Sequence, residues 1–248
     1  MATSIATKSL ESSDLLSSPL SFTSTTALTT AGSATGVTLT SGLARKTTSY
    51  AGSGLIDTTV LYRADDYTDN GANKMYLKNM SATPAEYFTV YVTGDRATEV
   101  HGNADEGLTE IGRLYAGDWM FMPWNANSGT KETFTVTIAN TWASGDTFVF
   151  DGVTVVAADS TVNNIAAQID AAQYPNWVTT NVDAVVTFVA RYSNAGIEID
   201  TSEAVSTTAG DGTGAVATTV EGARSKSDIY IKPSVHTDMT LEHILFYE

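Results

Sequence analysis

The sequence predicts a mainly β protein, in which an antiparallel β-sandwich or jelly-roll-like domain carries an inserted small α+β module and an extended N-terminal arm. Short runs of alternating apolar and polar residues, separated by turn residues, recur from residue 58 onward and are typical of antiparallel strands. This pattern changes near residue 125 and returns near residue 224. We therefore expect an arm over 1–49, a discontinuous β domain over 50–124 plus 224–248, and a module over 125–223.

The stretch 111–124 (IGRLYAGDWMFMPW) is the densest in large side chains and holds two of the four tryptophans, Trp119 and Trp124. A fully buried side chain of this size stabilises a fold by about 1.5–3 kcal/mol. We therefore read this stretch as a core strand, with turn residues at 116–118 just before the strand and Pro123 at its end.

The arm over 1–49 is close to half Ser and Thr and shows no clear strand or helix period. Alone it buries too little apolar surface to offset the entropy of ordering it. We expect it to dock instead into grooves of a neighbouring subunit. The apolar anchors for this docking are Leu10, Leu15, Leu16, Leu20, Phe22, Leu28, Val37 and Leu39.

The β domain is expected to begin with a short strand at 60–62, followed by a turn that contains Asn70-Gly71. The further expected strands are 74–80, 86–93, 228–232 and 240–247, with a polar loop over 94–107. If the chain after Trp124 once turned directly into Asp228, the module is an insertion in a hairpin loop, where few contacts are interrupted.

The module is expected to contain a strand at 133–139 and a hairpin over 146–156 that turns at Asp151-Gly152. A helix should follow, capped by Ser160, because Val162, Ile165, Ala166 and Ile169 recur at helical spacing. The remaining expected strands are 177–182, 184–190, 196–200 and 215–221.

Composition excludes several classes of function. The 248 residues include 42% hydrophobic and 17% charged residues, with 13 basic against 28 acidic side chains and a net charge of -15. Nucleic-acid binding needs clustered Lys and Arg and is not expected. The negative charge is explained either by a partner with a basic surface or simply by solubility, and both explanations remain open. The chain has no cysteine, no apolar run of the roughly 18 residues that a membrane helix needs, and no recognisable signal peptide.

No catalytic residue, cofactor site or metal site is predicted. His101, His236 and His243 lack ligand spacing, no serine stands in a GxSxG motif, and the glycines of 210–214 lack the Lys and helix of a phosphate loop. Turn chemistry explains the acidic loop as well as calcium binding does. This loop consists of Asp65, Asp66, Asp69 and Asn70, and a weaker acidic group consists of Asp200, Glu203 and Asp211.

Trp124, Trp142 and Trp177 are candidates for a sugar-stacking platform, but core packing is the expected role of these side chains. Hydrolysis of a cell-wall polymer usually needs a pair of carboxylates in a cleft, and no such pair is distinguishable. We expect a protein that is not an enzyme.

Three segments carry a resemblance to a known class of proteins: RADDYTDNGANKMYLKNMSATPAEYFTVYV, GRLYAGDWMFMPW and SDIYIKPSVHTDMTLEHILFYE. They resemble virion structural proteins of tailed bacteriophages, notably those of marine cyanobacterial phages. The stretch GDTFVFDGVTVVAADSTVNNIAAQIDAAQYPNW looks like a small α+β module that recurs in phage virion proteins. Together these segments cover roughly two fifths of the chain, and they identify no site residue.

The resemblance implies a capsid decoration or cement protein, made in the host cytoplasm and placed on the outer surface of the capsid. Its partners would be the major capsid protein or other virion proteins and further copies of itself, a trimer being common among decoration proteins. A tail, neck or fibre component is the alternative within this class. From a different class, the module would be a glycan-binding adhesive domain that uses exposed aromatic side chains.

Overall fold

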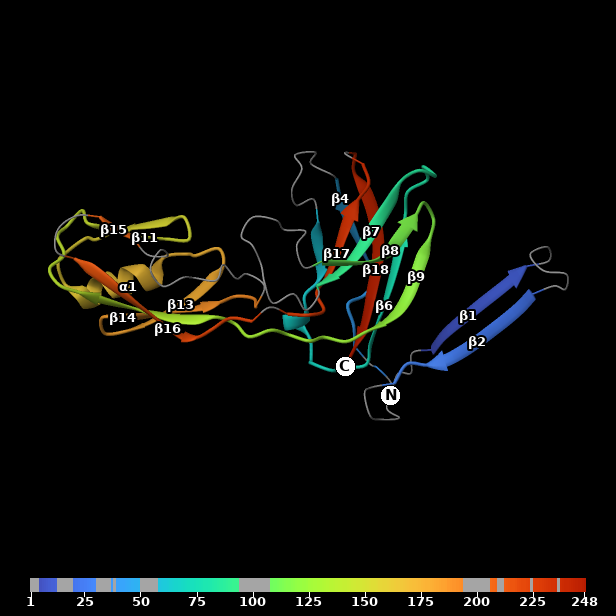
Figure 1. Cartoon of the computed structure of the whole chain (residues 1–248), viewed down its shortest axis with the longest axis horizontal. Coiled ribbons are helices and arrows are strands. Elements are labelled where there is room, and N and C mark those ends of the chain that lie inside the picture. The colour runs from blue at the N-terminus through green and yellow to red at the C-terminus, as the bar shows by residue number, and fades with distance from the viewer. Residues whose placement is uncertain are drawn as a thin grey trace. The chain divides into compact units, whose positions relative to one another are not determined.

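The computed structural model describes residues 5–12, 20–29, 37, 39–49, 58–93, 108–193, 206–208, 212–223, 225–235 and 237–248. The chain divides into two compact units, one made of Met1–Asn127 with Lys226–Glu248 and the other of Ser128–Ser225. The described residues form mostly antiparallel strands and one α-helix (Figure 1), which confirms the mainly β prediction.

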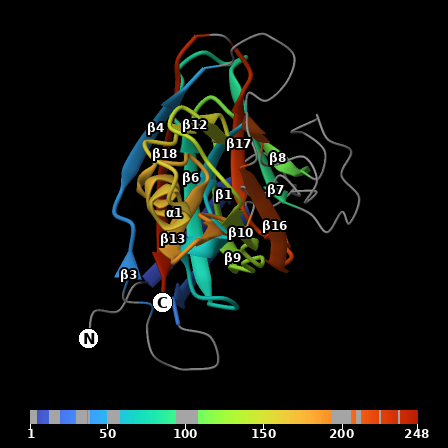
Figure 2. The same ribbon diagram turned by 90° about the vertical axis from the view of Figure 1, so that its left-hand side faces the viewer.

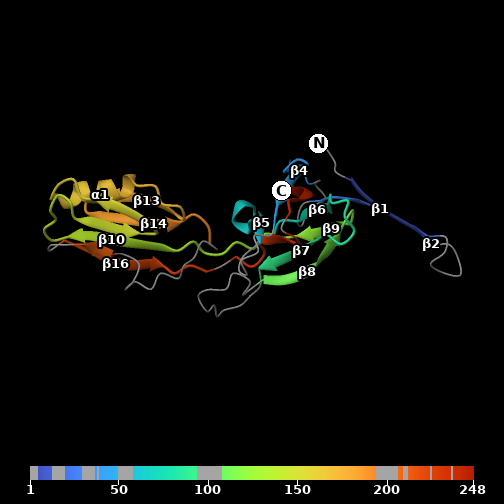
Figure 3. The same ribbon diagram turned by 90° about the horizontal axis from the view of Figure 1, so that it is seen from above.

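The first unit is a β-sandwich of two antiparallel sheets. One sheet contains, in order, β3 (Leu39–Thr40), β18 (Met239–Tyr247), β6 (Asn73–Asn79) and β9 (Trp119–Trp124), with β4 (Ala44–Thr48) also paired to β18. The other contains β5 (Thr59–Tyr62), β17 (Ile229–Pro233), β7 (Tyr87–Thr93) and β8 (Leu108–Tyr115). Figures 2 and 3 show β4 and β6 on one side of the sandwich and β7 and β8 on the other.

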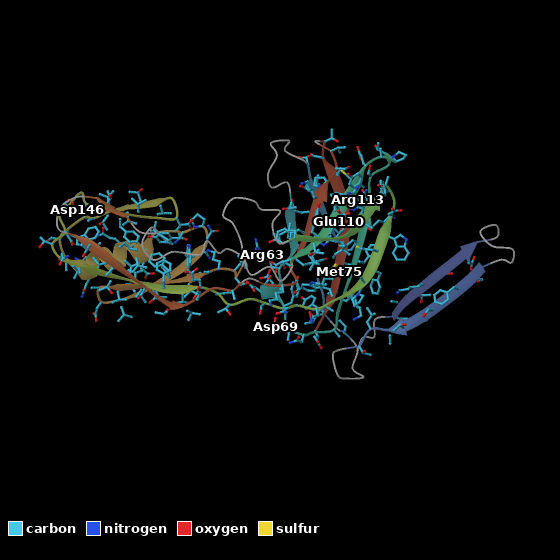
Figure 4. All side chains as sticks on the ribbon, viewed as in Figure 1. Arg63, Asp69, Met75, Glu110, Arg113 and Asp146 are labelled. Carbon is cyan, nitrogen blue, oxygen red and sulfur yellow. The ribbon has the colours of Figure 1, made fainter. Side chains whose placement is uncertain are left out.

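The core of the sandwich follows from period-two alternation along the strands. Met75, which is labelled in Figure 4, and Leu77 on β6 are fully buried, whereas the residues between and beside them are half-exposed. Side chains from both sheets meet in one apolar cluster, because each strand turns alternate residues inward. Its fully buried members include Phe88, Val90, Ile229, Ile231, Leu241 and Leu245.

The sequence suggested that the module interrupts a hairpin, and this interpretation is wrong. β9 and β17 lie in different sheets, so the chain leaves one layer of the sandwich and returns in the other. The two ends are tied together by hydrogen bonds at this point. The Trp124 Nε1–H donates to the Ser227 carbonyl oxygen at 2.7 Å, and the Asn127 N–H donates to the Ser227 Oγ at 2.7 Å.

The second unit is the α+β module. Its larger sheet runs in the order β13 (Trp177–Val182), β14 (Val185–Ala190), β10 (Thr133–Ala139) and β16 (Thr213–Val220). A smaller sheet contains β12 (Val153–Val156), β11 (Thr147–Phe150) and β15 (Ser206–Thr208). The helix α1 (Val162–Ala171) and the smaller sheet pack on one face of the larger sheet (Figure 1), around Phe134, Phe148 and Phe188.

Local predictions in the module are largely confirmed. Asp151 and Gly152 turn the hairpin with φ angles of 47° and 73°, and the helix buries Ile165, Ala166 and Ile169. The helix start differs, because its N-cap residue is Thr161 and no side chain caps it. The Asp159 carboxylate instead accepts a hydrogen bond from the Thr161 N–H at 2.8 Å. The strand expected at 196–200 lies outside the described residues.

The N-terminal region contains more regular structure than its composition indicated. β1 (Ile5–Ser12) and β2 (Leu20–Ala27) form an antiparallel hairpin with a register from Ile5↔Ala27 to Ser12↔Leu20. β3 and β4, although within 1–49, pair with β18 and belong to the sandwich. Both residues of β3 and most residues of β4 are exposed, so neither strand shows the alternation of apolar and polar residues that would have predicted it.

The stretch 111–124 is not one core strand. It comprises the end of β8, a turn and the whole of β9, in which only alternate residues can face the core. Trp124 is buried and 6% exposed, whereas Trp119 is 55% exposed. Pro123 does not end the strand, because β9 continues to Trp124 beside β6.

We predict that Trp124→Phe lowers the free energy of unfolding by about 1–3 kcal/mol, because the buried Ser227 carbonyl loses its donor. Trp119→Phe is the matched control on the same strand and should change it by less than about 0.5 kcal/mol. Urea denaturation followed by circular dichroism measures both. Equal stabilities of the two variants would show that the hydrogen bond does not secure the ends of the insertion.

Candidate interaction surfaces

The three tryptophans considered for sugar stacking are all buried. Trp124, Trp142 and Trp177 are 6%, 1% and 3% exposed, so they form no platform. Trp142 and Trp177 belong to the core of the module, where Trp177 packs edge-on against Phe134 at 5.1 Å between ring centroids. Core packing, the expected role, is therefore confirmed for these side chains.

The acidic loop is held against the backbone where the insertion begins. Asp65 and Asp66 lie in the short 3-10 helix η1 (Ala64–Asp66), and Asp69 forms a β-bridge with Ala126. Asn70 adopts a positive φ of 60°, and its N–H donates to the Ala126 carbonyl at 2.9 Å. Within the described part of the chain, no group of three or more histidine or acidic side chains is arranged to hold a metal ion.

Of the three histidines, His101 and His236 lie outside the described residues, as do Asp200, Glu203 and Asp211. His243 is half-buried between the sheets, where its Nδ1 is 2.9 Å from the Tyr62 hydroxyl. Burial lowers the pKa of His243, and the nearby charge of Lys46 lowers it further. Burial also raises the pKa of the Tyr62 hydroxyl. The pair is therefore neutral and structural at neutral pH.

The outward face of the β3–β18–β6–β9 sheet carries an aromatic surface. It consists of Tyr76 on β6, Trp119 and Phe121 on β9, and Ile244 and Phe246 on β18. Tyr76 lies 6.3 Å from Trp119 and Phe121 lies 6.4 Å from Phe246 between ring centroids. Such a concentration of apolar rings outside the core is typical of a contact surface.

A groove of about 470 Å³ runs over this aromatic surface, and the start of the N-terminal hairpin forms part of its wall. Ile5 to Lys8 and Leu28 line it together with the side chains of the sheet. Of the apolar anchors predicted in the arm, Leu28 and Val37 are buried and Phe22 and Leu39 are exposed. Leu15 and Leu16 lie outside the described residues.

The N-terminal hairpin itself is a two-stranded sheet on which Ile5 and Phe22 are 63% and 53% exposed. An isolated two-stranded ribbon is marginally stable in water. By contrast, the exposed edge strand β8 carries an ion pair, Arg113 Nε to Glu110 Oε1 at 3.1 Å (Figure 4). Charges of this kind protect an edge from pairing with another chain.

Comparisons with family models, with curated proteins and with solved structures found no match to this chain. Within its described residues, no helix is long and apolar enough to cross a membrane, and the only α-helix has ten residues. The proposed function therefore rests on the N-terminal hairpin and the aromatic surface, together with the sequence resemblance.

We predict that the stability of the sandwich falls as the pH drops below about 6.5, the unfolded-state value for histidine. The folded-state pKa of His243 is lower, so the unfolded chain binds the proton more readily and stability is lost toward the folded-state value. His243→Gln should remove this part of the loss between pH 7 and pH 5. Tyr62→Phe, which keeps the imidazole, should retain it. Urea denaturation across this pH range measures the difference, and an unchanged slope in His243→Gln would contradict it.

Proposed function

We propose that the protein is a non-enzymatic structural component of a tailed-phage virion and acts as a capsid decoration or cement protein. In this role, the sandwich and the N-terminal hairpin grip the capsid lattice. The partners are the major capsid protein or other virion proteins and further copies of this chain. The sequence resemblance supports the virion class, and the two surfaces of the first unit support a role in assembly.

The observation that carries the proposal is the N-terminal hairpin. In the described residues, β1 and β2 pair only with each other and leave both outer edges open to a further strand. Each strand also offers an exposed apolar side chain, Ile5 on β1 and Phe22 on β2. A ribbon of this kind gains stability when a neighbouring molecule adds strands or covers its apolar side chains.

The aromatic surface supplies a second contact, because Trp119 is the kind of large exposed side chain that dominates binding energies at interfaces. The same surface favours the alternative of glycan binding, since Trp119 and Tyr76 together offer a stacking face. This alternative places the glycan on the sandwich, because the tryptophans of the module are buried. A tail, neck or fibre location is the other alternative, and cryo-electron microscopy of the intact virion distinguishes it from the head.

We predict that deletion of residues 1–27 abolishes binding to capsids that lack this protein and leaves the sandwich folded. The cut spares Leu28 and Val37, which are buried and joined by a hydrogen bond, and it spares β3 and β4. Co-sedimentation with capsids measures binding, and circular dichroism verifies folding. Phe22→Asp should weaken binding at least about tenfold. Ser21→Asp, which adds the same charge at the neighbouring exposed position, is the control. Undiminished binding by the deletion variant would contradict the role of the hairpin.

We predict that Trp119→Ala weakens capsid binding by about tenfold or more while the midpoint of unfolding stays unchanged, because this side chain is more than half exposed. A glycan array probed with the same variant separates the two functions. Loss of glycan binding with intact capsid binding would favour the adhesive alternative. Val156→Ala, which removes an exposed apolar side chain from β12 of the module, is the control for non-specific effects.

A further inference from the structure

The larger sheet of the module has a second face that none of its described elements covers extensively. The helix and the smaller sheet pack on the face that carries Phe134 and Phe188. On the opposite face, Val178 and Val182 are 49% and 74% exposed, and Val220 is 42% exposed. Val178 and Val182 lie on the edge strand β13 and Val220 lies on the opposite edge strand β16, so apolar side chains are exposed at both edges of this face. Exposed apolar side chains that share one face indicate a contact surface.

This open face contains no charged residue. One row of directly paired positions crosses all four strands and consists of Thr180, Thr187, Thr135 and Ala217. The rows on either side hold only Val, Thr and Ala. None of the four strands contains Asp, Glu, Lys, Arg or His at any position, although the chain as a whole has a net charge of -15.

Two threonine hydroxyls, one on β10 and one on β16, have acceptors within the sheet. The Thr135 Oγ1 donates to the Ala217 carbonyl at 3.3 Å, and the Thr219 Oγ1 donates to the Thr133 carbonyl at 3.0 Å. Covering these two side chains therefore leaves neither hydroxyl proton without an acceptor, which lowers the desolvation cost of a contact. The face behaves as an apolar surface of small, stiff side chains.

We propose that the open face of the larger sheet is a self-association surface, on which the module of one chain packs against the same face of a second copy. A basic partner would find no carboxylate here, and a nucleic acid would find no Lys or Arg. The face also lacks the aromatic rings on which sugars stack. A second copy meets it with the same small uncharged side chains, so a two-fold contact buries no charge.

The absence of charge on this face matters because copies of the chain repel one another. Two copies with a charge of -15 each repel one another, and a contact that holds neither sign of charge avoids adding like-charge pairs at the interface. Four strands about 4.8 Å apart and six residues about 3.3 Å apart span roughly 400 Å² per copy. Such an area falls below that of a standard stable interface, so we expect a weak association, and the test below brackets a Kd on the order of 100 μM.

Because the chain has no cysteine, a single introduced thiol reports on this face alone. The test uses the full-length variant Thr187→Cys at the centre of the face and Thr154→Cys on β12, an exposed threonine outside the larger sheet, as the matched control. The rate of reaction with a maleimide is compared at about 5 μM and about 1 mM protein, which bracket the expected Kd. We expect the Thr187→Cys thiol to react about fivefold more slowly at the higher concentration, and the Thr154→Cys thiol to react equally at both.

Adding Thr135→Arg to Thr187→Cys should abolish the protection, because it places a like charge at the centre of both faces. Circular dichroism verifies that this variant folds, and Val178→Cys, a second thiol on the same face, provides a test that does not depend on Thr187. Raising the salt concentration from about 20 mM to about 500 mM should increase protection, because it screens the repulsion between the copies.

Equal reaction rates of the Thr187→Cys and Val178→Cys thiols at both concentrations would overturn the proposal. Equal slowing of the face and control thiols would also overturn it, because that result indicates non-specific aggregation. The inference names a surface for the self-association in the proposed function but does not rest on capsid binding. Capsid co-sedimentation of Thr135→Arg separates the two, since a failure of self-association leaves the binding of the hairpin unaffected.

Discussion

The hydrogen bond from the Trp124 indole to the Ser227 carbonyl is the constraint on which the division of the chain depends. The module is inserted along the chain between β9 of one sheet and β17 of the other, so the chain has to leave and re-enter the sandwich at neighbouring points. Asp228 continues the closure, because its buried carboxylate accepts a hydrogen bond from the Ala64 N–H at 2.8 Å. Its own N–H donates to the Thr93 hydroxyl. The Trp124 bond therefore links the two sheets where the chain leaves and returns, and the two Asp228 bonds fix the returning chain beside β5 and β7 within one sheet.

Local structure was predictable wherever one short segment contains its own signal. The strand at 133–139, the Asp151-Gly152 turn and the apolar side of the helix each follow from spacing within about ten residues. The pairing of distant strands leaves no such trace. β9 is apolar throughout and β17 alternates, and neither pattern indicates which strand it pairs with; only the three-dimensional arrangement shows that they belong to different sheets. The hairpin-loop interpretation failed for this reason.

The surfaces were harder to predict than the core, because alternation says which residues share a face but not which face is buried. Trp119 and Trp124 stand an odd number of positions apart on β9, so burial of one implies exposure of the other. Size alone suggested that both were core residues. In the arm, β1 and β2 are rich in Ser and Thr, and a register between them becomes visible only when both strands are placed together.

The distribution of charge bears both on the large apolar surfaces of the first unit and on the open face of the module. Acidic residues give every copy a net charge of -15, which opposes unspecific association in solution. Specific contacts must then use places where that charge is absent or offset. The hairpin and the aromatic surface offer exposed Ile5, Phe22 and Trp119, and large apolar side chains suit a firm contact with a different protein. The open face of the module offers only small side chains, which suit a weak contact that gains strength when many copies are held close together.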